Sequence, residues 1–145
     1  KARNEAEKEA AYMTKRKRPH QPAPFTRVRA QRITEKEGFQ TVSTGYLDYM
    51  LNELEIFLIP DKKLVTDAGY TEFKMNALAE YQDTIHAHGL VMVPVKQTKE
   101  DGKTLITGGD LLIHYTSESD KQEKIDKLRD CILAIYKDAT KEFFR

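Results

Sequence analysis

The chain has one cysteine, Cys131, and no long apolar run. A single cysteine cannot form an internal disulfide and cannot supply the ligand set of a zinc ribbon or finger. No stretch approaches the roughly 20 consecutive apolar residues that a membrane-spanning helix needs, so the sequence argues against a membrane protein. The low cysteine content fits a reducing, cytosol-like compartment.

Motifs for phosphate chemistry or nucleophilic catalysis are also missing. There is no phosphate-binding G-x-x-x-x-G-K-[ST] loop, and Gly108-Gly109 precedes Asp110, whose charge would repel a phosphate. Asp61, Asp67, Asp101 and Asp110 each fall at a turn or a helix start, where aspartate commonly makes local hydrogen bonds. Cys131 lies beside the apolar Ile132 within a helical pattern, and not at a helix N-terminus that would activate a thiol. We therefore expect no enzymatic activity and no cofactor.

Two closely spaced histidines, His86 and His88, resemble a metal-ligand pair. On a helix, however, residues two positions apart point in nearly opposite directions and cannot both face one ion. Gly89 then marks the helix end, where positively charged histidines would suit the helix dipole. The sequence predicts no metal site.

What the chain does have is one domain's length and an uneven distribution of charge. Its 145 residues contain 39% hydrophobic and 32% charged residues, which is enough for one core. The net charge is only +1, yet residues 1–38 hold 11 Lys/Arg against 5 Glu, whereas residues 39–145 hold 13 basic against 18 acidic residues. A basic end on a mildly acidic body is typical of a chain that meets a polyanion.

We assign residues 1–37 to a basic N-terminal arm. The segment RPHQPAPFT carries three prolines and favours an extended conformation. Basic side chains there could neutralise phosphates of double-stranded DNA, and Phe25 could stack on a base. The arm could instead bind a protein partner or neighbouring subunits, or it could be a solvated tail. The candidate nucleic-acid-binding residues are Lys15, Arg16, Lys17, Arg18, Arg27, Arg29 and Arg32.

Residues 38–145 are predicted to form a single, mainly α-helical domain with a small β-hairpin. One helix is expected from about Ser43 or Thr44 to Leu58, and a second from about Ala68 to His88. A hairpin is expected near residues 90–107, because two apolar runs flank an Asp101-Gly102 turn. The predicted order is helix, helix, hairpin and long C-terminal helix (α+β).

The C-terminal helix gives the clearest pattern. Ser117 or Ser119 can cap it, and an apolar face then continues for about 24 residues. Helices this amphipathic in a small domain favour burial against neighbouring subunits, so we expect a homo-oligomer. The residues expected to lie in the core or the oligomer interface are Leu128, Ile132 and Ile135.

From Lys17 onward the order of segments resembles the small terminase subunits of tailed bacteriophages. The resemblance rests on the basic, proline-containing KRKRPHQPAPF, on Leu64-Val-Thr-Asp67 before a second helix, and on residues 77–93, ALAEYQDTIHAHGLVMV. It covers about 125 residues. The chain departs from the family pattern at Gly109-Asp110-Leu111 and at its C-terminal segment.

The resemblance implies a non-enzymatic DNA-packaging protein. Such a protein would recognise viral DNA as an oligomeric ring and deliver it to the large motor subunit, in the cytoplasm of an infected host cell. A different class of protein also fits: a virion structural protein, such as a head-tail connector or tail terminator, whose arm laces into neighbouring subunits. A third reading is a cellular assembly factor that docks through its arm.

Overall fold

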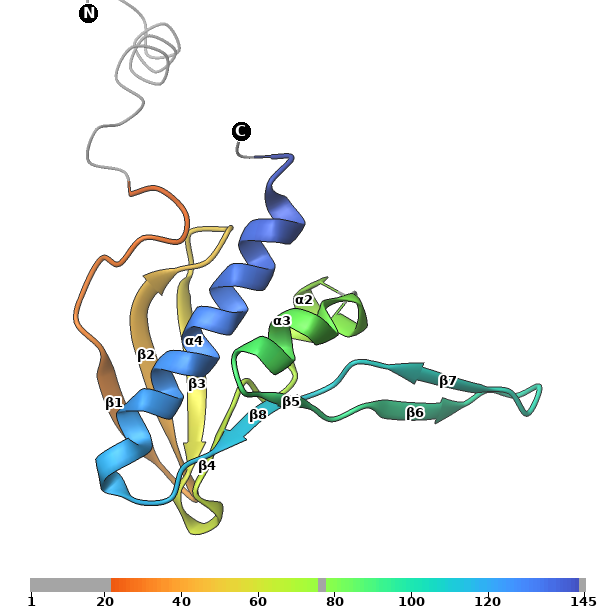
Figure 1. Ribbon diagram of the computed structural model, residues 1–145, viewed down its shortest axis with the longest axis horizontal. Helices are drawn as coiled ribbons and strands as arrows, with labels where there is room; N and C mark the ends of the chain where they lie inside the picture. Colours follow the sequence, from red (N-terminus) through yellow and green to blue (C-terminus); the bar gives the residue numbers. More distant parts are fainter. Residues whose placement is uncertain (1–21, 76–77, 144–145) are drawn as a thin grey trace, which may run out of the picture.

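The fold is a six-stranded antiparallel sheet covered on one face by a long helix (Figure 1). The computed structural model describes residues 22–75 and 78–143. The strands, in their spatial order, are β1 (Arg32–Lys36), β2 (Phe39–Leu47), β3 (Glu53–Ile59), β4 (Leu64–Thr66), β8 (Leu111–His114) and β5 (Val91–Met92). The prediction of a mainly α-helical domain is therefore wrong.

The segment predicted as the first helix, residues 43–58, forms the end of β2 and all of β3 except its last residue, Ile59. Its leucines fit a helical spacing, but residues 53–59 also alternate, and Leu54, Ile56 and Leu58 all point into the core. A helix could not run through this segment, because Gly45 and Leu51 have φ values of 84° and 67°. Pairing of β2 with β3 overrides the weaker helical pattern.

The second predicted helix, residues 68–88, is divided into three short pieces. These are α2 (Tyr70–Met75), the 3₁₀ turn η2 (Leu78–Tyr81) and α3 (Gln82–Ala87). Ala68 and Gly69 both have positive φ, so the backbone turns sharply before α2 begins. Gly89, at φ 81°, follows α3 in the left-handed conformation that the sequence led us to expect at a helix end.

The long C-terminal helix, α4 (Glu118–Thr140), is confirmed. Ser117 and Asp120 form a reciprocal capping box, in which each side chain accepts a backbone hydrogen bond at the start of the helix. These backbone N–H groups hold the pKa of Asp120 below its usual value. Leu128, Ile132 and Ile135 are fully buried in the hydrophobic core, in one cluster with Ile56 and Val65 of the sheet. They are therefore core residues and have no surface to offer a neighbour.

One part of the chain departs from the expected boundaries. Residues 32–36, which we assigned to the arm, form β1 at the edge of the sheet. A hairpin occupies the expected region, and its strands β6 (Val95–Thr98) and β7 (Thr104–Thr107) form a separate two-stranded sheet. This hairpin projects well away from the body (Figure 1). The tight 3₁₀ turn η1 (Pro60–Lys62) connects β3 to β4.

Candidate functional site

The segment before β1 is fastened to the end of β2. The backbone N–H of Phe25 donates to the Leu47 carbonyl at 2.9 Å, and that of Val28 donates to the Gly45 carbonyl at 2.7 Å. Gly45 permits this approach, because a Cβ at that position would collide with the carbonyl oxygen of Arg29. Residues 22–31 are thus ordered against the sheet, and they lead directly into β1.

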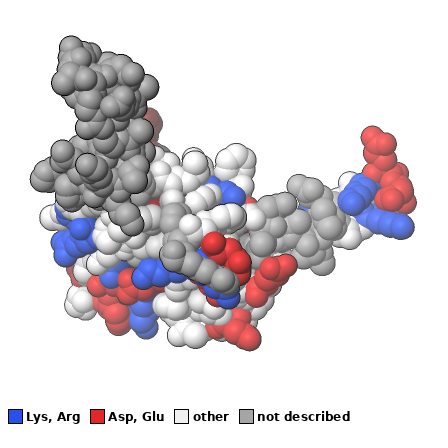
Figure 2. All heavy atoms as spheres, turned by 90° about the horizontal axis from the view of Figure 1, so that it is seen from above, with Lys and Arg blue, Asp and Glu red and all other residues white. Residues whose placement is uncertain are grey.

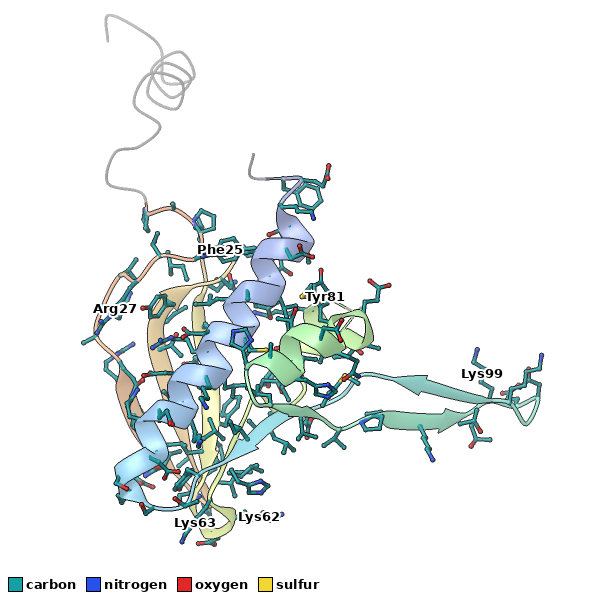
Figure 3. The ribbon with its side chains drawn as sticks, in the orientation of Figure 1. Phe25, Arg27, Lys62, Lys63, Tyr81 and Lys99 are labelled. Atoms are coloured by element: carbon teal, nitrogen blue, oxygen red, sulfur yellow. The ribbon has the colours of Figure 1, made fainter. Side chains whose placement is uncertain are left out.

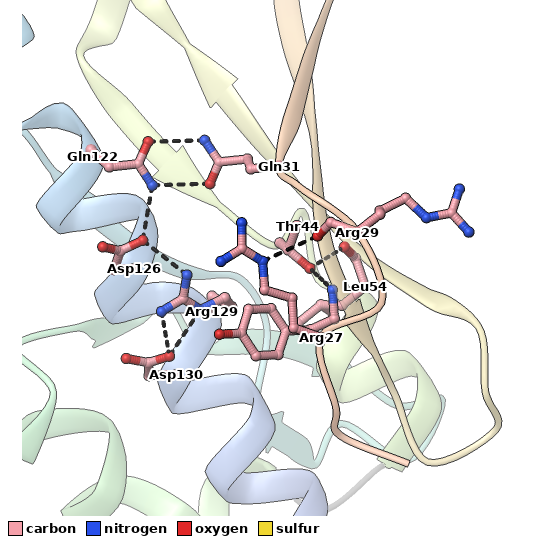
Figure 4. A network of polar contacts seen from close by, with 10 residues as sticks. Arg27, Arg29, Gln31, Thr44, Leu54, Gln122, Asp126, Arg129 and Asp130 are labelled. Atoms are coloured by element: carbon pink, nitrogen blue, oxygen red, sulfur yellow. Dashed lines mark hydrogen bonds and ion pairs between the residues drawn. The ribbon is translucent and has the colours of Figure 1, made fainter. Parts of the chain in front are cut away.

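Two of the three candidate arginines in this part of the chain share one carboxylate. Arg29 and Arg32 both lie near Oε1 of Glu53, at 3.5 Å and 3.2 Å. Arg27 donates from Nε to the carbonyl of Arg29, and it forms no ion pair with a described carboxylate (Figure 4). Lys15, Arg16, Lys17 and Arg18 lie outside the described residues.

A polar hollow of about 350 Å³ lies between this segment, β2 and α4. The side chains of Gln31 and Gln122 donate to each other, and Gln122 also donates to Asp126 (Figure 4). Arg129 pairs with Asp126 and Asp130 at 3.0 Å and 2.9 Å, and its guanidinium lies over the Tyr46 ring. These side chains are hydrogen-bonded or ion-paired with one another. Their contacts hold α4 against the segment that precedes β1.

The buried polar groups form a second cluster under α2. Asp67 accepts hydrogen bonds from the backbone N–H groups of Gly69, Thr71 and Leu111, while burial raises its pKa. Asp48 is completely buried and pairs with Lys74 at 3.0 Å. These carboxylates stabilise the turns that enclose them, and a small cavity of about 230 Å³ adjoins Asp67 and Lys74.

The structure also places the cysteine and the two histidines that the sequence analysis considered for catalysis and metal binding. Burial and the nearby Asp67 raise the pKa of the Cys131 thiol to about 12, so it stays protonated and is a poor nucleophile. His86 lies in the last turn of α3, and Nδ1 of His88 is 2.8 Å from the Thr84 carbonyl. Within the described residues no group of three His, Cys, Asp or Glu side chains could hold a metal ion. No helix in the described part of the chain is long and apolar enough to cross a membrane.

The face of the sheet opposite α4 carries apolar side chains, a feature that the sequence interpretation missed. Phe39 of β2, Phe57 of β3 and Tyr70 of α2 form a row of contacting rings, with centroids 6.1 Å and 5.9 Å apart. A shallow hollow of about 400 Å³ lies over them, and Ile59 and Ala68 contribute to its lining. Phe39 and Tyr70 are exposed, although both are large and apolar. We call this surface, made by Phe39, Phe57, Ile59, Ala68 and Tyr70, the outer apolar face.

Neighbouring strands extend the outer apolar face. The pairing register places Phe57 beside Thr66, Thr66 beside Leu112, and Leu112 beside Val91 on the edge strand β5. An antiparallel sheet with one solvated face usually alternates apolar and polar residues, with polar ones outward. An uncovered apolar row is therefore typical of an interaction surface. The alternation of residues 53–59 could have revealed it had that segment been read as a strand.

The hairpin β6–β7 is the second exposed apolar feature. Its base carries Val93 and Val95, which are 42% and 41% exposed. Together with Val91 of β5, they form a series of valines at every second residue. The tip carries charges of both signs around Lys99 (Figures 2 and 3). Among the described residues, β6 and β7 form strand pairs only with each other. An isolated two-stranded hairpin is marginally stable in water, which favours a partner for this one.

Comparisons with protein-family models, with curated proteins and with solved structures found no match to this chain.

Proposed function

We propose that this protein is a non-enzymatic structural subunit that assembles with copies of itself. The projecting hairpin carries this proposal, since it extends beyond the body and exposes valines at its base. The outer apolar face supports it, because a sheet covered on one side by α4 leaves an apolar surface on the other. The buried carboxylates and the protonated thiol do not form a catalytic arrangement.

Of the two phage functions considered above, this geometry favours the virion structural protein over the small terminase subunit. The terminase resemblance depends on two helices before the hairpin, and strands occupy the first of these segments. A connector or tail-terminator subunit needs a surface that receives a neighbour and an extension that reaches one. The hairpin provides such an extension, in addition to the arm that the sequence suggested.

The oligomeric state tests this proposal. We expect light scattering after gel filtration to show an oligomer of the intact chain at tens of micromolar. Replacing residues 97–105 by Asn-Gly keeps a short turn but removes the hairpin tip, and this variant should be monomeric. Asp101→Asn keeps the full hairpin and a favourable turn, so it should assemble as the intact chain does. A monomeric intact chain, or full assembly without the tip, contradicts the proposal.

Nucleic-acid binding is a second candidate function, which one observation favours. Arg27 is exposed and has no carboxylate partner among the described residues, and it follows the basic run at residues 15–18. If about half of the seven candidate basic residues contact phosphates, log K should fall with log salt with a slope of about −3 per subunit. Fluorescence anisotropy with duplex DNA at several salt concentrations measures this slope.

Two variants that each remove four positive charges distinguish DNA binding by the arm from a general effect of the protein's charge. Changing the four basic residues at 15–18 to Ala should flatten the salt dependence and weaken binding. The control removes four exposed lysines of the body, and it should leave the slope unchanged. The control positions are Lys36, Lys62, Lys137 and Lys141. Equal effects of both variants, or no binding by the intact chain at low salt, would rule out a DNA-binding arm.

A further inference from the structure

The hairpin formed by β6 and β7 has two edges that pair with no other strand in the described part of the chain. It projects away from the body, so the body does not cover these edges (Figure 1). A hairpin of two strands alone is marginally stable in water, and additional strands stabilise it. The free edges are therefore places where a further strand can add.

The edge of β7 lacks the features that usually prevent strand addition. β7 has the sequence Thr-Leu-Ile-Thr, without charge or proline, and three of its four residues are β-branched. By contrast, β6 contains Lys96 and directly follows Pro94, β1 contains three charged residues, and β5 is only two residues long. Charges, proline and short length are the usual protection of an edge strand. Of the edge strands that the structure describes, β7 alone is unprotected.

The hydrogen bonds of the hairpin determine which backbone groups of β7 point outward. The backbone N–H of Lys99 donates to the carbonyl of Lys103 at 2.8 Å, so these residues form a hydrogen-bonded pair. Hydrogen-bonded and non-hydrogen-bonded pairs alternate along an antiparallel ladder. The register of β6 with β7 therefore makes Leu105 a hydrogen-bonded position within the hairpin. Thr104 and Ile106, on either side of it, direct their backbone N–H and C=O groups to the free edge.

A second copy of β7 fits this edge in a definite register. Thr104 lies opposite the partner's Ile106, and Ile106 lies opposite the partner's Thr104, so that each pair exchanges two backbone hydrogen bonds. Leu105 then lies opposite the partner's Leu105, on a two-fold axis. Lys103, the charged residue next to β7, lies opposite the partner's Thr107 and not opposite a second lysine. This register uses all the outward backbone groups of both strands.

Other strands of the same protein fit the β7 edge less well. Residues 1–21 contain no valine, isoleucine, phenylalanine or tryptophan, and 10 of these 21 residues are charged. Their composition favours a strand much less than that of β7 does. The free edge of β6 carries Lys96, so pairing of β6 with a second β6 would bring two lysines close together. A second β7 is thus the occupant that the sequence and the register favour.

We propose that β7 of one copy pairs antiparallel with β7 of a second copy, which joins the two hairpins into one four-stranded sheet. The strand order of this sheet is β6, β7, β7 and β6, with the second pair from the partner. The same strand contributes from both copies, so the contact is closed and produces a dimer, and a larger oligomer needs a second contact. This inference rests on the proposed self-assembly and names the strand that performs it.

The two-fold axis at Leu105 gives a test by charge. Leu105→Lys and Leu105→Glu should each raise the dissociation constant of the dimer by about 10-fold or more, because like charges then lie directly opposite each other. An equal mixture of the two variants should restore dimers with one chain of each kind, measured by native mass spectrometry. Thr98→Lys, at an exposed position of β6, is the control and should leave the dissociation constant unchanged. Unimpaired assembly of both Leu105 variants, or a mixture that does not recover, would overturn the inference.

Disulfide formation then identifies the paired residues directly. Leu105 and the partner's Leu105 form a non-hydrogen-bonded pair, whose Cα atoms lie about 4.5 Å apart, within the range that a disulfide bridges. In a Cys131→Ala background, Leu105→Cys should therefore give a covalent dimer under mild oxidation, whereas Thr98→Cys should give none. An oligomer that cross-links through Thr98→Cys and not through Leu105→Cys overturns the pairing of β7 but leaves self-assembly in place. A monomeric intact chain overturns both.

Discussion

At the scale of single residues, Asp67 connects two parts of the chain that are far apart in the sequence. It is 1% exposed and accepts hydrogen bonds from three backbone N–H groups, one of which belongs to the distant strand β8. It therefore joins the turn before α2 to β8, the strand beside the edge strand β5. Replacing it removes the acceptor for all three donors at once.

We predict that Asp67→Ala lowers the free energy of unfolding by about 2–4 kcal/mol, because buried donors lose their acceptor. Urea denaturation followed by circular dichroism measures this change. Asp83→Ala, at an exposed position in the first turn of α3, is the control and should change the stability by less than about 0.5 kcal/mol. Equal effects of both substitutions would show that the Asp67 hydrogen bonds contribute little.

The raised pKa of Asp67 gives stability a pH dependence of definite sign. Burial is the main cause, and hydrogen bonds from the Thr71 side chain and from three backbone N–H groups oppose it only in part. Because the folded state holds this proton more tightly than the unfolded state, the contribution of Asp67 to stability falls as pH rises from about 3.8 through the raised pKa. Asp67→Asn should remove this component. A series of unfolding curves between pH 3 and 7 (about the range in which carboxyls titrate) should therefore show that the stability of the intact chain, relative to that of the variant, falls as pH rises; a difference that does not change with pH would contradict the assignment.

At the scale of elements, α4 and the strands differ in how far sequence alone determines them. The helix was predictable, since its capping residues and its apolar period agree over the whole length. Residues 43–58 fit two periods, and the choice between them depends on strand pairing, such as that of Thr41 with Phe57, which the periodicity of the segment does not reveal. The outer apolar face could not be foreseen from a helical interpretation of β3. Likewise, the sharing of Glu53 by Arg29 and Arg32 depends on the fold, not on local spacing.

Gly45 allows a prediction about how the N-terminal segment is attached to β2. Its Cβ would collide with the Arg29 backbone, so Gly45→Ala should destabilise the protein by about 2 kcal/mol or more. Gly38, with the same φ of 84° and nothing within 4 Å of an added Cβ, is a matched control. Gly38→Ala should cost only about 1 kcal/mol, the penalty of the left-handed backbone alone. Denaturation of the two variants compares them, and a smaller effect at Gly45 would contradict the close approach.

At the scale of the whole molecule, the chain has one well-packed core and two features that this core does not cover. The core lies between α4 and the inner face of the sheet. The hairpin and the outer apolar face lie outside it, and their exposed valines and rings are unusual for a monomer. Both features become buried if copies of the chain assemble.

Assembly of this kind links stability to concentration. We predict that the apparent Tm of the intact chain rises with protein concentration, because association stabilises the folded state. The variant with residues 97–105 replaced by Asn-Gly should show no such rise. Differential scanning fluorimetry over a hundredfold range of concentration measures both. A concentration-independent Tm for the intact chain would indicate a monomer.

The position of β8 in the sheet has a consequence for folding. β4 pairs with β8, and residues 67–110 separate these two strands along the chain. The β1–β2–β3–β4 meander can form from local contacts. The free edge of β4, however, stays unpaired until the 44 residues of segment 67–110 close into a loop that brings β8 beside it. Such non-local pairing slows folding, and on a ribosome it must wait until β8 has been synthesised. Until then the edge of β4 is an unpaired template for other chains, so the nascent protein passes through an aggregation-prone stage that the finished sheet no longer shows.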